Sequence, residues 1–168
     1  VFMVKDKHEN KSCLDELKKN YKELQEKYSL PSFDSLNRDF QIEKVAECET
    51  DYLIREIRKC ISDKFSNYLH FIEAILNPVN APLFVFSVIK SIGVDEKNKL
   101  SETYKELVRF EVILMKLDID FSEEKEAEFI RDSYETWQKI KKDVLDVVEI
   151  MEDNLDNKFE ANNKGYFG

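Results

Sequence analysis

The chain has 168 residues, of which 42% are hydrophobic and 36% charged, with only three glycines and three prolines. This length is typical of one domain, and so much charge with so little turn chemistry favours long amphipathic helices over sheets. The net charge of −9 argues against nucleic acid or an anionic membrane as partner, because phosphate groups repel an acidic chain.

The cysteines indicate a reducing compartment. Cys13, Cys48 and Cys60 are an odd number, are widely spaced and form no Cys-x-x-Cys pair. This pattern predicts free thiols in a cytoplasmic protein and no disulfide scaffold or zinc ribbon. No run approaches the roughly 20 apolar residues of a membrane span, and no signal peptide is visible.

Two helices are predicted near the start of the chain. Residues 1–11 are polar after the first four and are expected to be flexible. Ser12 suits the N-cap of a helix that ends before Pro31. Residues 31–40 fit a second, short helix. The first of these helices has apolar residues at alternating spacings of three and four, namely Leu14, Leu17, Tyr21, Leu24 and Tyr28.

A central helix is predicted over residues 43–76, which contain no Gly or Pro. Asn77-Pro78 ends it, because a residue before proline avoids the helical region. Its apolar residues recur every third or fourth position and form one stripe: Ile54, Ile57, Ile61, Phe65, Tyr68, Ile72 and Leu76.

Residues 83–92 (LFVFSVIKSI) are apolar on nearly every side. Pro82 and Gly93 at their two ends suit a short helix. One interpretation is that this helix is buried and completes the core. The alternative is that Phe84 and Phe86 reach the surface and form a patch for a partner or for a second copy of the chain.

Two further helices are predicted, over residues 95–117 and 122–156. Ser122 suits the N-cap of the last one, and acidic residues in its first turn suit the positive end of the helix dipole. Residues 157–168 lose the apolar pattern and are expected to be a flexible tail. We therefore predict an all-α fold, an irregular antiparallel bundle of about five helices, with one domain over 12–156.

Arg58 and Glu111 each interrupt an apolar stripe, at matching depths on helices expected to be neighbours. A charge buried alone costs several kcal/mol, whereas a buried pair roughly breaks even. We predict that these two residues form an ion pair across the bundle. The alternative is that Arg58 extends to the rim and has no partner, in which case its removal costs well under about 1 kcal/mol.

No catalytic, cofactor-binding or metal-binding residue is predicted. The two histidines, His8 and His70, do not supply the paired Glu-x-x-His motifs of a di-metal bundle. Asp118-Ile-Asp120-Phe-Ser122 begins like a calcium loop, but Glu123 stands where glycine is needed and Phe129 where glutamate is needed. No motif brings a histidine to a serine or cysteine, and there is no glycine-rich phosphate loop.

Several motifs together resemble small all-helical archaeal proteins of unknown function. They are the stretch from Tyr28 to Phe40, the segments Leu53-Ile-Arg-Glu-Ile-Arg and Leu76-Asn-Pro, and Glu126-Ala-Glu-Phe-Ile followed by Trp137. The resemblance covers about residues 28–150. It implies a cytosolic helical protein and transfers no active site.

The favoured function is a non-catalytic interaction or adaptor protein, which acts through an apolar helix groove or by self-association. The partner is then an unknown protein or a second copy of the chain. The alternative is an Mg²⁺-dependent helical hydrolase of a nucleotide or phosphate ester. Its metal would be held by acids on the outer side of the last helix, namely Asp146, Glu149, Glu152, Asp153 and Asp156.

Overall fold

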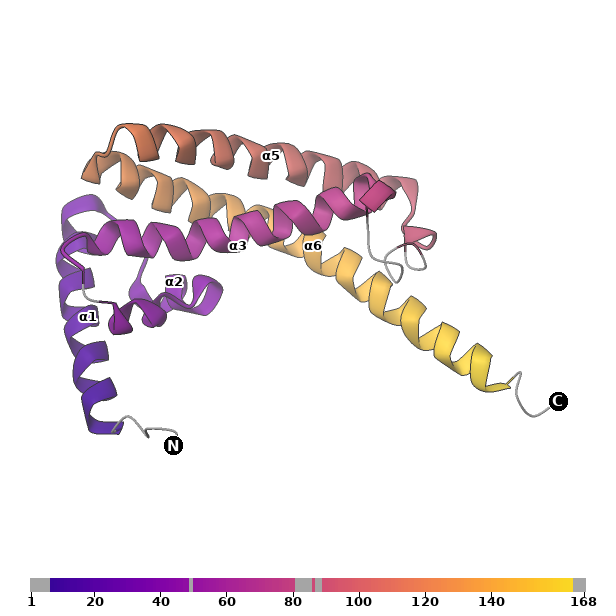
Figure 1. Ribbon diagram of the computed structural model, residues 1–168, viewed down its shortest axis with the longest axis horizontal. Coiled ribbons are helices and arrows are strands. Elements are labelled where there is room, and N and C mark those ends of the chain that lie inside the picture. Colours follow the sequence, from indigo (N-terminus) through magenta and orange to yellow (C-terminus); the bar gives the residue numbers. More distant parts are fainter. Residues whose placement is uncertain (1–6, 49, 81–85, 87–88, 165–168) are drawn as a thin grey trace. The chain divides into compact units, whose positions relative to one another are not determined.

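The computed structural model describes the backbone of residues 7–48, 50–80, 86 and 89–164, and the side chains of residues 12–48, 50–79, 86 and 89–155. Helices make up nearly all of this part of the chain, and no β-strand occurs in it (Figure 1). The prediction of an all-α fold is confirmed. None of the described helices combines the length and the apolar content needed to cross a bilayer.

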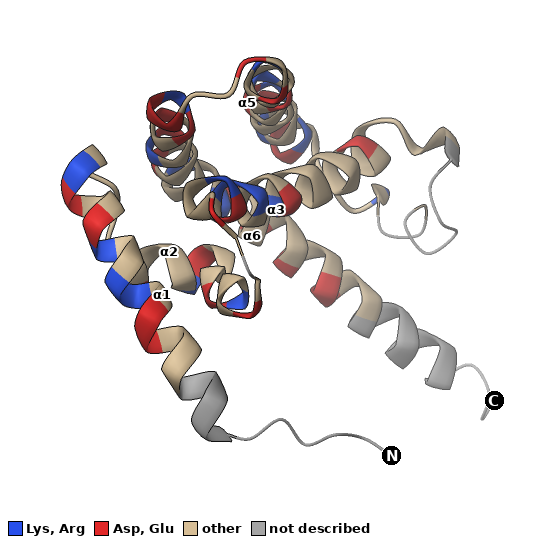
Figure 2. Cartoon of the chain, turned by 60° about the vertical axis from the view of Figure 1, so that its left-hand side comes forward, with Lys and Arg blue, Asp and Glu red and all other residues tan. Residues whose placement is uncertain are grey.

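The helices follow one another with short connections, and two of them are 3₁₀ helices. In chain order they are α1 (Lys7–Tyr28), α2 (Phe33–Phe40), η1 (Ile42–Glu47), α3 (Leu53–Leu76), η2 (Pro78–Asn80), α5 (Val94–Ile119) and α6 (Glu123–Lys164). Basic and acidic residues interleave along α1, α3 and α5 (Figure 2).

Local signals set the turn between α1 and α2, as predicted. Ser29 adopts φ 53°, and the N–H of Leu30 donates to the carbonyl of Gln25 at 3.2 Å, which is a Schellman end to α1. Ser32 caps α2, because its side chain accepts a hydrogen bond from the N–H of Ser35 at 3.2 Å.

The predicted central helix over 43–76 is wrong in its first ten residues. A short 3₁₀ helix ends at Glu47, Cys48 is extended with ψ 122°, and α3 begins only at Leu53. Thr50 accounts for the new start, since its hydroxyl accepts a hydrogen bond from the N–H of Tyr52 at 3.0 Å. This local bond competes with helix propagation, so the chain turns before it enters α3.

Two helix ends also differ from prediction. α1 begins at Lys7 and not at Ser12, and α6 continues to Lys164 and not to about residue 156. Neither extension contains Gly or Pro, and once a helix has formed each further residue adds a hydrogen bond at little cost. The apolar pattern therefore marks where a helix packs, while the helix itself extends further.

The chain divides into two compact units, 1–65 with 110–135 and 66–109 with 136–168. α3, α5 and α6 each contribute residues to both units. The single domain predicted over 12–156 stays a prediction, because the division describes packing and not independent folding.

The first unit is built on a row of aromatic rings from four helices. Phe40 of α2, Phe65 of α3, Phe110 of α5 and Phe129 of α6 follow one another at centroid distances of 6.2, 5.2 and 5.5 Å. Because Arg58 meets Asp118 while Phe65 meets Phe110, α3 and α5 run antiparallel here. The predicted antiparallel bundle is confirmed.

The second unit has its own apolar core. Trp137 of α6 packs against Tyr68 of α3 with ring centroids 5.3 Å apart. This unit also contains apolar residues that are at most 8% exposed: Ile72, Ile75, Ile92, Leu100, Leu107, Ile140, Val144, Val147 and Met151.

The predicted partner surface belongs to the second unit. Phe86 is 42% exposed. Phe84 lies outside the described residues. The choice between a buried plug and an exposed patch over residues 83–92 therefore stays a prediction.

Candidate binding cleft beside a buried ion pair

A buried ion pair ties α3, α5 and α6 together in the first unit. Glu126 is fully buried and Arg58 is 6% exposed. Arg58 Nε donates to Glu126 Oε2 at 2.9 Å, and its Nη2 donates to Asp118 Oδ1 at 3.0 Å. The guanidinium group thus joins one carboxylate from α6 to one from the end of α5, which holds both helices against α3.

A second arginine, Arg55, also lies close to the carboxylate of Glu126. Arg55 Nε lies 3.8 Å from Glu126 Oε1, and the guanidinium stacks 4.3 Å from the ring centroid of Phe121. Phe121 also meets Tyr52 edge-on at 5.6 Å. Two arginines therefore face two carboxylates, Glu126 and Asp118, so the cluster has no net charge.

The predicted pairing of Arg58 with Glu111 is corrected by this geometry. Arg58 has partners, but they are Glu126 and Asp118, and no ion pair joins it to Glu111 among the described residues. Glu111 lies beside Phe110, which contacts Phe65. It is thus seven residues, or about 10 Å, from the level of Arg58 along the helix axis.

The sequence contains a signal for the burial of Glu126. Glu126 precedes Ile130, Ser133 and Trp137 at spacings of four, three and four, so it lies on the apolar stripe of α6. A carboxylate on such a stripe needs a buried partner, as Arg58 does.

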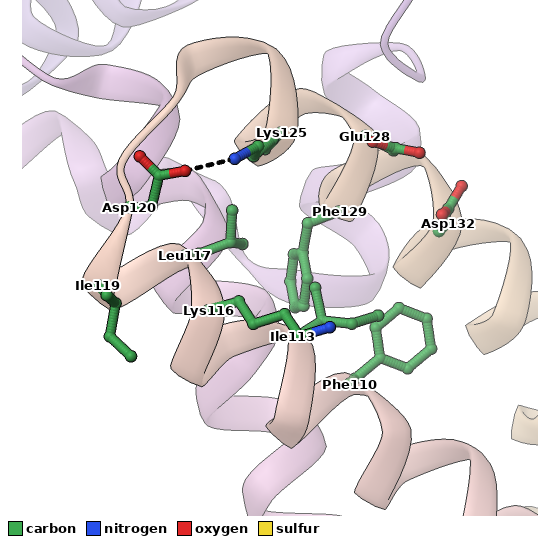
Figure 3. Close-up of a pocket in the computed structure, with 10 residues that line it drawn as sticks. All are labelled: Phe110, Ile113, Lys116, Leu117, Ile119, Asp120, Lys125, Glu128, Phe129 and Asp132. Carbon is green, nitrogen blue, oxygen red and sulfur yellow. Dashed lines mark hydrogen bonds and ion pairs between the residues drawn. The ribbon is translucent and has the colours of Figure 1, made fainter.

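An apolar cleft opens beside this cluster, between the end of α5 and the start of α6. Its volume is about 540 Å³. Figure 3 shows the rings of Phe110 and Phe129 and the side chain of Ile113 converging on its centre. The ion pair at Arg58 positions both walls of the cleft, because it holds α5 and α6 on the same helix.

Charged groups surround the apolar floor. Lys125 Nζ donates to Asp120 Oδ2 at 2.6 Å, and this bond lowers the pKa of the Asp120 carboxyl. Asp120 is therefore ionised at neutral pH and is poorly suited to act as a general acid. Glu128 and Asp132, one turn apart on α6, line the opposite edge and form no ion pair with any described residue (Figure 3).

A second cleft, of about 550 Å³, lies where α1 meets the start of α3 and of α6. Tyr28 Oη donates to Glu123 Oε2 at 2.6 Å, and Lys27 Nζ donates to the same oxygen at 2.9 Å. The pKa of the Glu123 carboxyl is lowered, first by the Tyr28 hydrogen bond and then by Lys27. These contacts fasten the end of α1 to the first turn of α6.

The lowered pKa of Glu123 has a testable consequence. Its folded-state pKa lies below its unfolded value, so the contribution of Glu123 to stability is present above the unfolded pKa and is lost as pH falls through the folded pKa. In Tyr28→Phe the pKa of Glu123 should rise toward an ordinary glutamate value, as measured by carbon-detected NMR titration. Tyr134→Phe, a half-buried tyrosine on the same α6 helix, is the control. An unchanged titration in Tyr28→Phe would show that the hydrogen bond is absent in solution.

The acids assigned to the alternative hydrolase form no recognisable metal site among the side chains that the structure describes. Glu149, Glu152 and Asp153 are exposed on α6, and the side chain of Asp156 lies outside the described part. In that part of the chain no group of three His, Cys, Asp or Glu side chains is placed to hold a metal ion. Nothing in this geometry favours the hydrolase.

Comparisons with protein-family models, with curated proteins and with solved structures gave no match to this chain.

Proposed function

We propose that this protein is a non-catalytic interaction module that binds an apolar helical segment, flanked by basic residues, of a partner protein. The binding site is the cleft between α5 and α6. One observation carries the proposal: aromatic and aliphatic side chains form the floor of the cleft, and two carboxylates without an ion-pair partner among the described residues stand on its edge.

The size of the cleft suits this kind of ligand. Its volume of about 540 Å³ falls within the roughly 300–1,000 Å³ typical of ligand pockets. Helical peptides bind such grooves by inserting apolar residues at i, i+3 or i+4 and i+7. Phe110, Ile113 and Phe129 offer the apolar contact surface that these anchors need.

The charges on the rim select the partner. Lys125 already pairs with Asp120, which leaves Glu128, Asp132 and Lys116 as the charged lining residues without an ion-pair partner in the described part of the chain. The chain as a whole carries −9, and this field attracts a basic segment and raises its association rate. A partner with Lys or Arg beside its apolar anchors therefore fits better than an acidic one.

The test uses two synthetic amphipathic helical peptides of equal length, one of Leu and Lys and the other of Leu and Glu. The Leu/Lys peptide should bind and shift the methyl NMR signals of Ile113 and Leu117, and the Leu/Glu peptide should not. The variant Glu128→Lys/Asp132→Lys should bind the Leu/Lys peptide about tenfold or more weakly, measured by calorimetry.

A matched control separates the cleft from the overall charge. Glu149→Lys/Asp153→Lys makes the same change of charge at two exposed positions one turn apart on α6, neither of which lines the cleft. This variant should bind the peptide about as well as the unchanged chain. Equal losses in both variants, or methyl shifts that avoid the cleft, would refute the proposal.

A further inference from the structure

α5 carries a second apolar stripe, on the side that faces away from the core of the first unit. Val112, Met115 and Ile119 are 48%, 63% and 87% exposed. They follow one another at spacings of three and four, so they lie along one line on the helix surface. At about 100° per residue this line is opposite to the buried residues of the same stretch, Phe110, Leu114 and Leu117.

A helix that is apolar on two opposite sides is typical of a helix covered on both. The core of the first unit covers only one of these sides. Three large apolar side chains are left in water on the other, and their burial would be favourable at roughly 25 cal/mol per Å². The outer stripe therefore has the character of an interface.

The spacing of the stripe is that of a coiled-coil seam, with Val112 and Ile119 at a positions and Met115 at d. The flanking g and e positions hold Glu111 and Lys116. Neither of these two residues forms an ion pair with another described residue, and no cation lies three or four places from Glu111 along α5. One helix thus presents an apolar seam with an acid on one flank and a base on the other.

These flanking charges complement one another only when two copies of the helix lie parallel. In a parallel pair, a g residue meets the e residue five places later on the other helix, so Glu111 meets Lys116 of the second copy. Five places separate these two residues in the chain. In an antiparallel pair g meets g and e meets e, which brings like charges together.

We infer that this protein self-associates by parallel packing of the outer face of α5 on the same face of a second copy. The surface is self-complementary about a two-fold axis parallel to the helix, as an isologous dimer requires. This inference does not rest on the proposed function, because it depends on the exposed stripe Val112, Met115 and Ile119 and not on peptide binding, although Lys116 and Ile119 also line the cleft.

The dimer should be weak, because only three seam positions contribute. Interfaces smaller than the standard size dissociate at micromolar or higher concentration, so we expect a dissociation constant of about 10–100 µM. Sedimentation equilibrium from about 1 µM to about 1 mM at physiological salt should show the mass doubling. A chain that stays monomeric over this range overturns the inference.

A first variant tests the seam. Met115→Asp should remain monomeric at every concentration, because it places a charge at the central d position. Leu145→Asp is the matched control, since Leu145 is a 55% exposed apolar residue of α6 and is not part of the seam. It should dimerise as the unchanged chain does. If Leu145→Asp abolishes the dimer and Met115→Asp preserves it, the interface lies elsewhere.

Charge reversals test the parallel orientation. Glu111→Lys and Lys116→Glu should each weaken self-association about tenfold or more, since each places like charges opposite one another. A mixture of these two variants should form a mixed dimer, and the double variant Glu111→Lys/Lys116→Glu should regain self-association. If mixing Glu111→Lys with the unchanged chain strengthens association instead, the helices are antiparallel and the inference is wrong.

The two proposals fail separately. A chain that remains monomeric but binds the Leu/Lys peptide in its cleft retains the proposed function and loses only the dimer. A chain that dimerises without binding the peptide shows the reverse.

Discussion

Replacing Arg58 by methionine should lower the free energy of unfolding by about 3–5 kcal/mol, measured by urea denaturation. Glu126 is fully buried, and without Arg58 its nearest cation is Arg55 Nε at 3.8 Å. A buried carboxylate without a close partner bears its full desolvation cost. Asp118 contributes little to this loss, because its side chain is 67% exposed and water can solvate it.

The double variant Arg58→Met/Glu126→Leu tests this explanation. It removes both charges, and buried pairs replaced by apolar residues of similar volume are often neutral in stability. We expect the double variant to recover most of the loss caused by Arg58→Met. Glu111→Gln should change stability by less than about 0.5 kcal/mol. A large effect of Glu111→Gln with none of Glu126→Leu would restore the pairing predicted from the sequence.

Replacing Phe65 by alanine should also lower the free energy of unfolding by about 3–5 kcal/mol. Phe65 is 1% exposed and lies between Phe40 and Phe110, with ring centroids 6.2 and 5.2 Å away. Removing the ring leaves a cavity and abolishes one tilted contact, with Phe40, and one edge-to-face contact, with Phe110. The measurement is again urea denaturation.

The substitution Phe65→Ala should also change the shape of the cleft between α5 and α6. Phe110 packs on Phe65 and forms part of the cleft floor, so Phe65→Ala should weaken binding of the Leu/Lys peptide as well as stability. Phe65→Leu keeps most of the volume and should cost less than about 1.5 kcal/mol. If alanine and leucine destabilise equally, the ring of Phe65 is not packed as the structure describes.

Features set by neighbouring residues could be predicted well. The end of α1 at Ser29-Leu30-Pro31, the stop of α3 before Pro78 and the start of α6 after Ser122 all agree with the structure. Each depends on a proline, a cap or a turn residue within a few positions. Their energies are local, so the sequence displays them directly.

Features that depend on alignment between helices could not be predicted. Matching depth along two apolar stripes predicts Glu111 as the partner of Arg58, and this prediction is wrong by about two turns. Helices can slide by whole turns without changing the spacing of their apolar residues. Only the packing of the rings of Phe65, Phe110 and Phe129 selects one alignment, which places Arg58 level with Glu126.

The sequence by itself determined that this chain is all-α and that no familiar catalytic motif is present, and it predicted a buried partner for Arg58 without excluding an unpaired Arg58 at the rim. Only the tertiary structure decided which carboxylates pair with Arg58, where the cleft between α5 and α6 lies, and which apolar side chains of α5 remain exposed. The physical reason is the difference in sequence separation between the residues that interact. Helix formation is governed by bonds between residues four apart, whereas a cleft or a buried pair is governed by side chains that meet from distant parts of the chain.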